Sequence, residues 1–526
     1  MTGRRRSSSV RSCDSAFSTQ SSQHRRQSLI NRLEHFTSIL LILLERLITG
    51  ITFILPKSII SFFTNVVRLI LNLRRTDNSA YDRLISQQET VLSTDGYLRR
   101  IESLRAAETF EDLCAVNSYV CENHLVCTDD GYLLTIHRLN PESNGFRPNG
   151  KAVFLQHGLL MNSEIWCVRI KKSENIPFRL CQLGYDVFLG NNRGNKYSCK
   201  QRDHNVKDRK FWDFSIDEFA QFDMPACINY VLKFKGIPSL SFIGFSQGCS
   251  QILASISIHK DLNDKIDKLV LIAPATTPKR LANWLINSIV NLQPKMFYFL
   301  FGRKIIMQSI CSWFSIVYPP LMVKLIDIPN QILFDWHSKN IDILQKLICY
   351  FHLFSTTSVK CVVHWFQIIR SNKFQMYQDS EMFEPFEYPI HQAMHIPKVL
   401  LIYGMADSLV DIDVILDQLP DFDSVNVNQL KYDDSTVASS SDSSSYQPLS
   451  EKAPLSSIEE VNNESAPDSD VDNVKVNETR VTSTEESDPK SQLHIFGVEN
   501  YEHLDLLWGK GVETAVIRHV LEFLGH

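Results

Sequence analysis

From residue 119 onward, short apolar runs alternate with segments whose apolar positions recur at helical spacing. Continuous apolar runs bounded by turn residues are typical of strands that are buried on both faces. Such strands are expected within 151–160, 184–194, 240–243, 268–275, 398–404 and at the start of 493–509. Two more strands are expected in 122–139, around the turn Asp129-Asp130-Gly131. Because buried strands alternate with helices, the pattern predicts an α/β fold with a mostly parallel sheet.

Two long segments depart from this alternation. Residues 278–395 contain aromatic-rich helical stretches and no clear strand, which predicts a helical cap inserted between core strands. So many aromatic side chains must either be buried or face an apolar ligand. Residues 433–490 hold 14 Asp or Glu, 4 Lys or Arg and many serines. This acidic insertion is expected to be disordered, because it has too little apolar surface to fold.

Residues 34–75 form a strongly apolar region with polar interruptions, one of which is Pro56-Lys57. A cleaved signal peptide fits poorly, because a long arm precedes the region and no small-residue cleavage site follows it. A single membrane span over 47–67 would place Lys57 in mid-bilayer, whereas a hairpin or interfacial segment bent at Pro56 avoids that cost. A pair of core helices is the remaining alternative. Because arginines flank the region on both sides, we expect it to associate with a membrane.

Changes in composition divide the chain into parts. The first 32 residues carry seven arginines and one aspartate, with much of the rest Ser and Gln, which predicts a disordered basic arm. The expected parts are the basic arm (1–33), the membrane-associated hydrophobic region (34–75), a linker helix (76–110), the α/β core in three pieces (111–277, 396–432 and 491–526), the cap (278–395) and the acidic insertion (433–490).

Composition also narrows the classes of function. The net charge of −5 over 526 residues gives no sign of nucleic-acid binding. Twelve cysteines occur without a Cys-x-x-Cys pair, and Cys227, Cys249 and Cys349 lie in apolar helical patterns. This usage indicates reduced, buried thiols in a protein that faces the cytosol. No spacing typical of zinc ligands occurs, so neither a metal nor another cofactor is expected.

The stretch GFSQG, residues 244–248, places Ser246 between a short apolar strand and a helix that is expected over 247–258. A strand that turns directly into a helix forces the turn residue into a strained, exposed conformation, and glycine is needed two positions away on either side to avoid collisions. The helix amino terminus beneath the serine would favour developing negative charge. These features predict a nucleophilic serine, with an ordinary glycine-rich loop as the alternative.

A nucleophilic serine needs a base within hydrogen-bond reach and an acid that fixes the tautomer of that base. Asp407 lies three residues beyond the strand that ends at Gly404, and His503 lies in the loop after the last predicted strand. Acid and base therefore follow Ser246 in the order expected along an α/β sheet. Nearby competitors are expected to serve other roles: Asp411 and Asp413 to cap a helix, Asp505 to cap or pair locally, His494 to lie in a strand, and His519 and His526 to lie on or beyond the last helix.

A tetrahedral oxyanion needs two converging N–H donors. The backbone N–H of Gln247, directly after the serine, is the first candidate. The second is Leu159, in the turn after an early strand, where Gly158 lets the backbone approach a substrate carbonyl. A plain strand-ending turn is the alternative for His157-Gly158.

Several stretches together resemble the acid lipase family of α/β-hydrolases, which includes gastric and lysosomal lipases. They are, in chain order, QHGLLMNSEIWC, GYDVFLGNNRGNKYS, FWDFSIDEFAQFDMPACINYV, GFSQG, GMADSLVDIDV and NYEHLDLLWG. The resemblance covers about residues 111–432 and 491–526 and is strongest to the membrane-anchored yeast branch, the steryl ester hydrolases of lipid droplets. It implies the α/β-hydrolase fold, a catalytic triad and an oxyanion hole, with the triad formed by Ser246, Asp407 and His503 and the hole by Leu159 and Gln247.

Two features depart from the gastric and lysosomal pattern. An arginine arm and an uncleaved hydrophobic region stand where those relatives carry a cleavable signal, so operation in an acidic lumen is not implied. The acidic insertion separates Asp407 from His503, which a disordered loop tolerates because closing a longer loop costs little.

The sequence therefore predicts a serine-dependent hydrolase of lipid esters, with steryl esters favoured on the resemblance alone. A triacylglycerol lipase, a thioesterase or acyltransferase, and a non-catalytic lipid-binding or tethering protein are the alternatives. Expected partners are the lipid ester, a membrane or lipid-droplet surface, and protein kinases that act on the serine-rich segments. The expected location is the lipid droplet or the endoplasmic reticulum membrane, with the catalytic domain in the cytosol.

Overall fold

The computed structural model describes residues 62, 66, 96–278, 290–291, 293–306, 319–379, 384–430 and 491–525. The predicted basic arm, all but two residues of the hydrophobic region, and the acidic insertion lie outside these residues. Within the described part of the chain, no helix combines the length and apolar character needed to cross a membrane.

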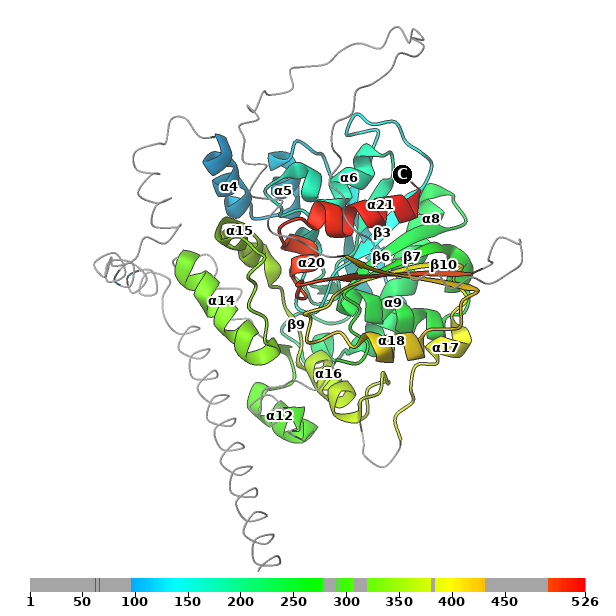
Figure 1. Cartoon of the computed structure of the whole chain (residues 1–526). Coiled ribbons are helices and arrows are strands. Elements are labelled where there is room, and N and C mark those ends of the chain that lie inside the picture. The colour runs from blue at the N-terminus through cyan, green and yellow to red at the C-terminus, as the bar shows by residue number, and fades with distance from the viewer. Residues whose placement is uncertain are drawn as a thin grey trace, which may run out of the picture.

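A ten-stranded sheet forms the centre of the molecule (Figure 1). Its order is β1-β2-β4-β3-β6-β7-β10-β12-β11, with β5 paired to β2. The pairs made by β2 are antiparallel, and all pairs from β4 to β11 are parallel. The strands are β1 Glu122–Cys127, β2 Tyr132–Leu139, β3 Ala152–Gln156, β4 Asp186–Leu189, β5 Lys200–Gln201, β6 Leu240–Phe245, β7 Ile266–Ile272, β10 Lys398–Gly404, β11 Ser424–Leu430 and β12 Gln492–Val498.

The predicted α/β fold with a mostly parallel sheet is confirmed. Strands β3, β4 and β6 are buried at every position, as expected for strands covered on both faces. The edge strand β11 is not predicted by the hydrophobic pattern. Its Val425 and Val427 are 49% and 48% exposed and alternate with asparagine, so no buried apolar run marks this strand in the sequence.

Helices cover both faces of the sheet (Figure 1). On one face lie α6 (Ile176–Gln182) and α21 (Arg518–Leu524). On the other lie α9 (Gln247–Ile258), α17 (Ile390–Ala393) and α18 (Ile412–Gln418). Because helices cover both faces, the sheet is shielded from water, and the loops at the strand ends remain available for catalytic residues.

The cap between β7 and β10 is mainly helical in its described residues. Figure 1 shows its helices to one side of the sheet: α12 (Pro294–Phe301), α14 (Pro319–Phe334), α15 (Ile343–Leu353) and α16 (Val359–Ser371). The expectation that the cap lacks strands is wrong, because β8 (Ile305–Ile306) pairs antiparallel with β9 (Thr357–Ser358). Strands of two residues are too short to leave a period in the sequence.

The described part of the predicted linker helix is packed onto the molecule. Helix α4 (Gly96–Ala106) buries Ile101 and Leu104, and the Leu104 carbonyl lies 2.9 Å from Nε2 of His352 on α15. Arg100 Nε donates to the Ile170 carbonyl at 2.7 Å. Helix α4 therefore binds both the core and the cap, although its sequence is mostly polar.

Candidate active site

Ser246 occupies the turn between β6 and α9, with φ 53° and ψ −119°. A positive φ is strained for a residue with a Cβ atom, and it turns the hydroxyl out from the end of the sheet. The flanking glycines leave the space this turn requires. A Cβ on Gly248 would lie 2.4 Å from the Gln156 carbonyl oxygen, and one on Gly244 would lie 2.9 Å from the Cys249 nitrogen.

The structure brings the three predicted reactive side chains together. His503 Nε2 lies 2.8 Å from Ser246 Oγ, and His503 Nδ1 lies 2.6 Å from Asp407 Oδ2. All three residues are buried, with exposures of 7% for Ser246, 5% for Asp407 and 2% for His503. Because Nδ1 faces a carboxylate it carries the proton, so Nε2 is the ring nitrogen that can accept the serine hydroxyl proton.

The acid and the base lie on neighbouring loops at the carboxyl ends of β10 and β12. A Cβ on Gly404 would lie 2.2 Å from the Tyr501 carbonyl oxygen, so the two loops are in close backbone contact there. The same Tyr501 carbonyl accepts from the Ala406 nitrogen at 3.1 Å. The second oxygen of Asp407 accepts from the Leu409 nitrogen at 2.9 Å, which fixes the orientation of the carboxylate.

The turn after β3 lies directly beside the serine. A Cβ on Gly158 would lie 3.1 Å from Ser246 Cβ, which places the next residue, Leu159, at the mouth of the site. Leu160 has a left-handed φ of 58°, and its carbonyl accepts from the Ser355 nitrogen of the cap at 2.6 Å. This turn and Gln247, the first residue of α9, therefore lie on either side of Ser246, where the two predicted N–H donors of an oxyanion hole are expected.

His157 is hydrogen-bonded to this turn. Burial lowers its pKa to about 4, so the ring is neutral at physiological pH. Nδ1 lies 2.8 Å from the Gly158 carbonyl and donates to it, while Nε2 accepts from the Asn192 nitrogen at 3.1 Å. The neutral ring therefore links the turn to the loop after β4.

A hydrogen bond from the cap fixes the side chain of Gln247. Trp365 Nε1 on α16 donates to Gln247 Oε1 at 2.7 Å. Trp365 and Gln247 are 118 residues apart in the sequence, and no local pattern relates them. The sequence therefore predicts Gln247 from its position beside the serine but does not predict its partner.

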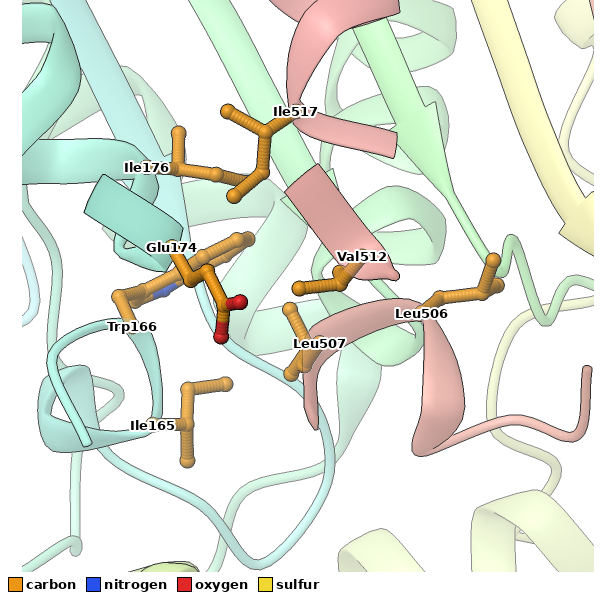
Figure 2. Close-up of a pocket in the computed structure, with 8 residues that line it drawn as sticks. All are labelled: Ile165, Trp166, Glu174, Ile176, Leu506, Leu507, Val512 and Ile517. Carbon is orange, nitrogen blue, oxygen red and sulfur yellow. The ribbon is translucent and has the colours of Figure 1, made fainter. Parts of the chain in front are cut away.

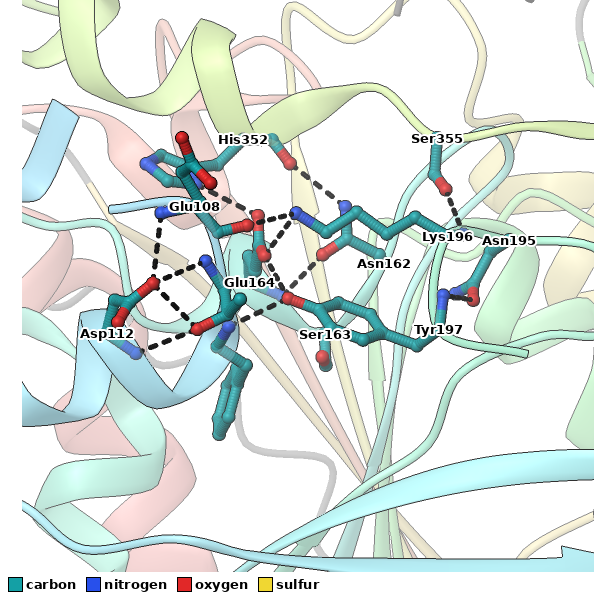
Figure 3. A network of polar contacts seen from close by, with 12 residues as sticks. Glu108, Asp112, Asn162, Ser163, Glu164, Asn195, Lys196, Tyr197, His352 and Ser355 are labelled. Carbon is teal, nitrogen blue, oxygen red and sulfur yellow. Dashed lines mark hydrogen bonds and ion pairs between the residues drawn. The ribbon is translucent and has the colours of Figure 1, made fainter. Parts of the chain in front are cut away.

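A buried ionic cluster is centred on Glu164, four residues after the turn formed by residues 158–160 (Figure 3). Glu164 lies 2.9 Å from Nδ1 of His352 and 2.5 Å from Nζ of Lys196, and it accepts from the Tyr197 hydroxyl. Burial opposes ionisation of Glu164, but the contacts with His352 and Lys196 outweigh it and hold the pKa of this carboxyl below its ordinary value. The cluster joins the core to cap helix α15 and, through the second nitrogen of His352, to α4.

The residues expected to compete with the triad lie elsewhere. His494 lies in β12 and His519 on α21, while His526 falls outside the described residues. Asp411 occupies the N-cap position of α18 and Asp413 lies in its first turn, but the Asp411 side chain makes no capping hydrogen bond, so its predicted capping role is wrong. Asp505 accepts from the Glu502 nitrogen at 2.8 Å, and burial raises its pKa to about 7.

A small pocket lies behind the loop after β12, which carries His503 and is called the base loop (Figure 2). It is lined by Ile165, Trp166, Glu174, Ile176, Leu506, Leu507, Val512 and Ile517, and none of the three reactive side chains is among these lining residues. Its one carboxylate, Glu174, is already paired with Arg169 and with Lys171 at 3.3 Å. We interpret this pocket as a packing gap under the base loop.

Comparisons with known proteins agree with the fold. Residues 110–170 match the model described as a partial α/β-hydrolase lipase region, and residues 151–307 match the α/β hydrolase fold. A probable lipase of Schizosaccharomyces pombe is 39% identical over 396 residues, which is 73% of this chain and 82% of the relative.

Two animal relatives are also similar. Human gastric triacylglycerol lipase is 30% identical over 57% of this chain and 79% of its own length. A putative lysosomal acid lipase/cholesteryl ester hydrolase of Crotalus adamanteus is 30% identical over 51% of this chain and 68% of its own length. These matches extend over most of each relative, so the likeness is not confined to the serine motif.

Proposed function

Since the chain belongs to the acid lipase family of α/β-hydrolases and is a carboxylic ester hydrolase that acts on lipid esters, we propose that Ser246, His503 and Asp407 carry its reaction and that steryl esters at a lipid surface are its substrates. The observation that carries the first part is the pair of contacts at His503, 2.8 Å to Ser246 Oγ and 2.6 Å to Asp407 Oδ2.

In the acylation step, Ser246 Oγ attacks the ester carbonyl carbon while His503 Nε2 takes the hydroxyl proton. The N–H groups of Leu159 and Gln247 stabilise the oxyanion of the tetrahedral intermediate. His503 then delivers the proton to the leaving alcohol oxygen, and the acyl group stays on Ser246. Asp407 orients the imidazole and stabilises the imidazolium during these transfers.

In the deacylation step, water replaces the alcohol. His503 Nε2 takes a proton from the water as its oxygen attacks the acyl-enzyme carbonyl, and then returns that proton to Ser246 Oγ as the bond to the fatty acid breaks. The products are an alcohol and a fatty acid.

An acyl-trapping experiment tests the assignment of the nucleophile. The purified protein is mixed with a water-soluble ester such as p-nitrophenyl butyrate and quenched in acid within the first turnover. Peptide mass mapping is expected to place the butyryl group on Ser246. Turnover with the acyl group on another residue would overturn the assignment.

Steryl esters are proposed because aromatic side chains of the cap pack against the site and because one relative is a putative lysosomal acid lipase/cholesteryl ester hydrolase. Trp336 and Trp365 face His503 and Gln247 from the cap, and each is 6% exposed. Triacylglycerol is the second candidate, favoured by the match to gastric triacylglycerol lipase. Hydrolysis of steryl oleate and triolein in matched emulsions, with Ser246→Ala as the blank, decides between them. Faster release of oleate from triolein would favour the second candidate.

We propose that the enzyme acts at lipid droplets or the endoplasmic reticulum membrane, held there by residues 34–75, with its catalytic domain in the cytosol. The ten described cysteines support a reducing compartment, since all are free thiols and seven are buried. Deletion of residues 1–75 leaves α4 intact, and the protein is expected to keep its activity on a soluble ester but to cleave droplet-borne substrate poorly. Undiminished droplet activity would contradict this proposal.

Protein kinases are proposed partners of the serine-rich segment 433–490, where added phosphate charge would alter contacts with lipid or protein. Phosphopeptide mapping of the protein from its native cells tests this, and a segment without phosphate under all growth conditions would contradict it.

A further inference from the structure

The end of α14 and the segment that follows it contact both the loop that carries Asp407 (the acid loop) and the loop that carries His503 (the base loop). We call residues 334–340 the strap. The Phe334 carbonyl accepts from the Ser408 hydroxyl, next to Asp407. At the other end, Asn340 Nδ2 donates to the Asn500 carbonyl at 2.6 Å, three residues before His503. A piece of the cap therefore bridges the two loops that carry the acid and the base.

The backbone in the middle of the strap is held by Glu502, the neighbour of His503. The carboxylate accepts from the His337 nitrogen at 2.9 Å and from the Ser338 nitrogen at 2.7 Å. The strap is also strained, because Asp335 and Ser338 have left-handed φ values of 57° and 49°. Non-glycine residues keep such a conformation where surrounding contacts over-determine it, and this often occurs at functional sites.

This strained backbone carries Trp336 onto the face of the catalytic imidazole. The two ring centroids lie 4.9 Å apart, and the ring planes differ by only 7°. Phe334 stacks on Trp336 in turn, at 4.5 Å and 29°. One face of the His503 ring is thus covered by Trp336, and Phe334 packs against Trp336 in turn.

A stacked aromatic ring restrains a motion of the His503 side chain that its two hydrogen bonds do not restrain. The contacts at Nδ1 and Nε2 fix the two ends of the imidazole, but they resist only weakly a tilt of the ring about the line between them. A parallel ring against the face resists that tilt directly. The negative π face of the indole also attracts the imidazolium that forms during each proton transfer.

The indole N–H has no hydrogen-bond partner among the described residues and is buried. The contact with His503 therefore uses the plane of the ring and not its polar atom. A phenyl ring, which has the plane without the N–H, is expected to replace much of its effect.

We propose that Trp336 is a positioning residue of the catalytic base, and that Glu502 and the strap hold Trp336 in place. The proposal rests on the assignment of His503 as the base. Through this contact the cap takes part in the proton transfers and does more than enclose the substrate. The substrate for testing it is a small soluble ester, so that lipid binding by the cap does not enter the measurement.

The test compares Trp336→Leu with Trp336→Phe. Trp336→Leu is expected to lower kcat by about 10- to 100-fold, the range of a small displacement of a catalytic group, with KM changed less than about threefold. Trp336→Phe is expected to stay within about fivefold of the wild-type kcat, because the stacked plane remains. Rates are expressed per active site, titrated with a fluorophosphonate, so that misfolded protein is not counted.

Trp212→Leu is the matched control for loss of a buried tryptophan. Trp212 is 1% exposed and stacks edge-to-face on Phe211 at 5.0 Å, so its replacement also removes aromatic packing. It is expected to lower the melting temperature and to leave kcat per active site unchanged. If Trp336→Leu folds poorly, Glu502→Gln is the second variant. A neutral amide oxygen holds the strap less firmly than a carboxylate, so kcat is expected to fall about 3- to 10-fold.

The outcomes separate this proposal from the proposed function. His503→Ala with full activity would overturn the triad itself. An inactive His503→Ala together with wild-type kcat in both Trp336→Leu and Glu502→Gln would overturn the positioning role alone. Equal losses in Trp336→Leu and Trp336→Phe would also overturn it, because a stacked phenyl plane would then restore none of the activity.

Discussion

The two halves of the site are held in different ways. The nucleophile half, Ser246 with Leu159 and Gln247, is built from the adjacent strands β3 and β6, and its backbones meet with no room for a Cβ on Gly248. The acid–base half, Asp407 and His503, lies on loops that the strap of the cap bridges. The first half is rigid because of covalent geometry and main-chain packing. In the second half the two loops also meet through their main chains, and the strap adds contacts between residues distant in the sequence, so a change in the strap acts directly on the base.

The largest expected effect comes from substituting a triad residue in either half of the site. Ser246→Ala and His503→Ala are each expected to lower kcat by about 10⁶-fold, and Asp407→Asn by about 10⁴-fold, because the triad acts as a unit and the acid only orients the base. The measurement is hydrolysis of a soluble ester per folded molecule.

Asp411→Asn is the matched control, since Asp411 lies four residues after Asp407 and its side chain makes no capping hydrogen bond. Its activity is expected to equal that of the wild type. A larger loss in Asp411→Asn than in Asp407→Asn would show that the acid has been misassigned.

Overpacking tests the rigidity of the nucleophile half. In Gly248→Ala, the new Cβ would lie 2.4 Å from the Gln156 carbonyl oxygen and 2.9 Å from that of His157, and neither backbone atom can move without disturbing β3 and its turn. We expect unfolding free energy to fall by at least about 2 kcal/mol, and activity to be lost with it.

Gly96→Ala serves as the control for this change, because a Cβ there would have no atom within 4 Å. Chemical denaturation of both variants gives the comparison. Equal stability of the two variants would contradict the claim that main-chain packing holds the nucleophile half.

The same division explains what could be predicted from the sequence. The glycine spacing around Ser246 and the alternation of apolar strands are local features, and they predict the fold and the nucleophile half. Asp407 and His503 follow from strand order. The contact between Trp336 and His503, and the contacts between Glu502 and the strap, join residues more than 160 positions apart in the sequence. They leave no period or motif, so the strap could not be predicted. Strand β11 was missed for a different reason, since an edge strand need not be apolar.

Acid is expected to weaken the fold through buried neutral histidines. Burial lowers the pKa of His157 and of His137 to about 4, whereas both titrate near 6.5 when unfolded. Between these values the unfolded state binds more protons, so stability is fully present above about pH 6.5 and is lost progressively as the pH falls towards 4. The loss is of the order of a few kcal/mol.

Urea denaturation at several pH values measures this loss. His157 is hydrogen-bonded to the turn of the nucleophile half, so its protonation is expected to destabilise that half. An unfolding free energy that stays constant from pH 7 to pH 4.5 would contradict the prediction.

The smallest expected effect comes from the acidic insertion, which separates Asp407 from His503 in the sequence but makes no part of either half in our proposal. Strands β11 and β12 are parallel, with Leu430 opposite Val498 and Ser424 opposite Gln492. The chain that leaves β11 must therefore run back along the sheet by about 20 Å before β12 begins. Ser491 and Asp423 fix the point of return, since the Ser491 nitrogen donates to Asp423 Oδ2 at 2.8 Å.

Replacing residues 431–490 with a Gly/Ser linker of about 20 residues spans this distance easily. We expect kcat on a soluble ester to stay within about twofold of the wild type, because the register of β12, and hence the position of His503, is set by pairing with β10 on its other side. A three-residue linker is the matched control. It reaches at most about 14 Å, so β11 cannot pair with β12 and stability should fall. Loss of most activity in a well-folded protein with the long linker would mean that the insertion contributes to the acid–base half, and that the cap is not the main support of the base.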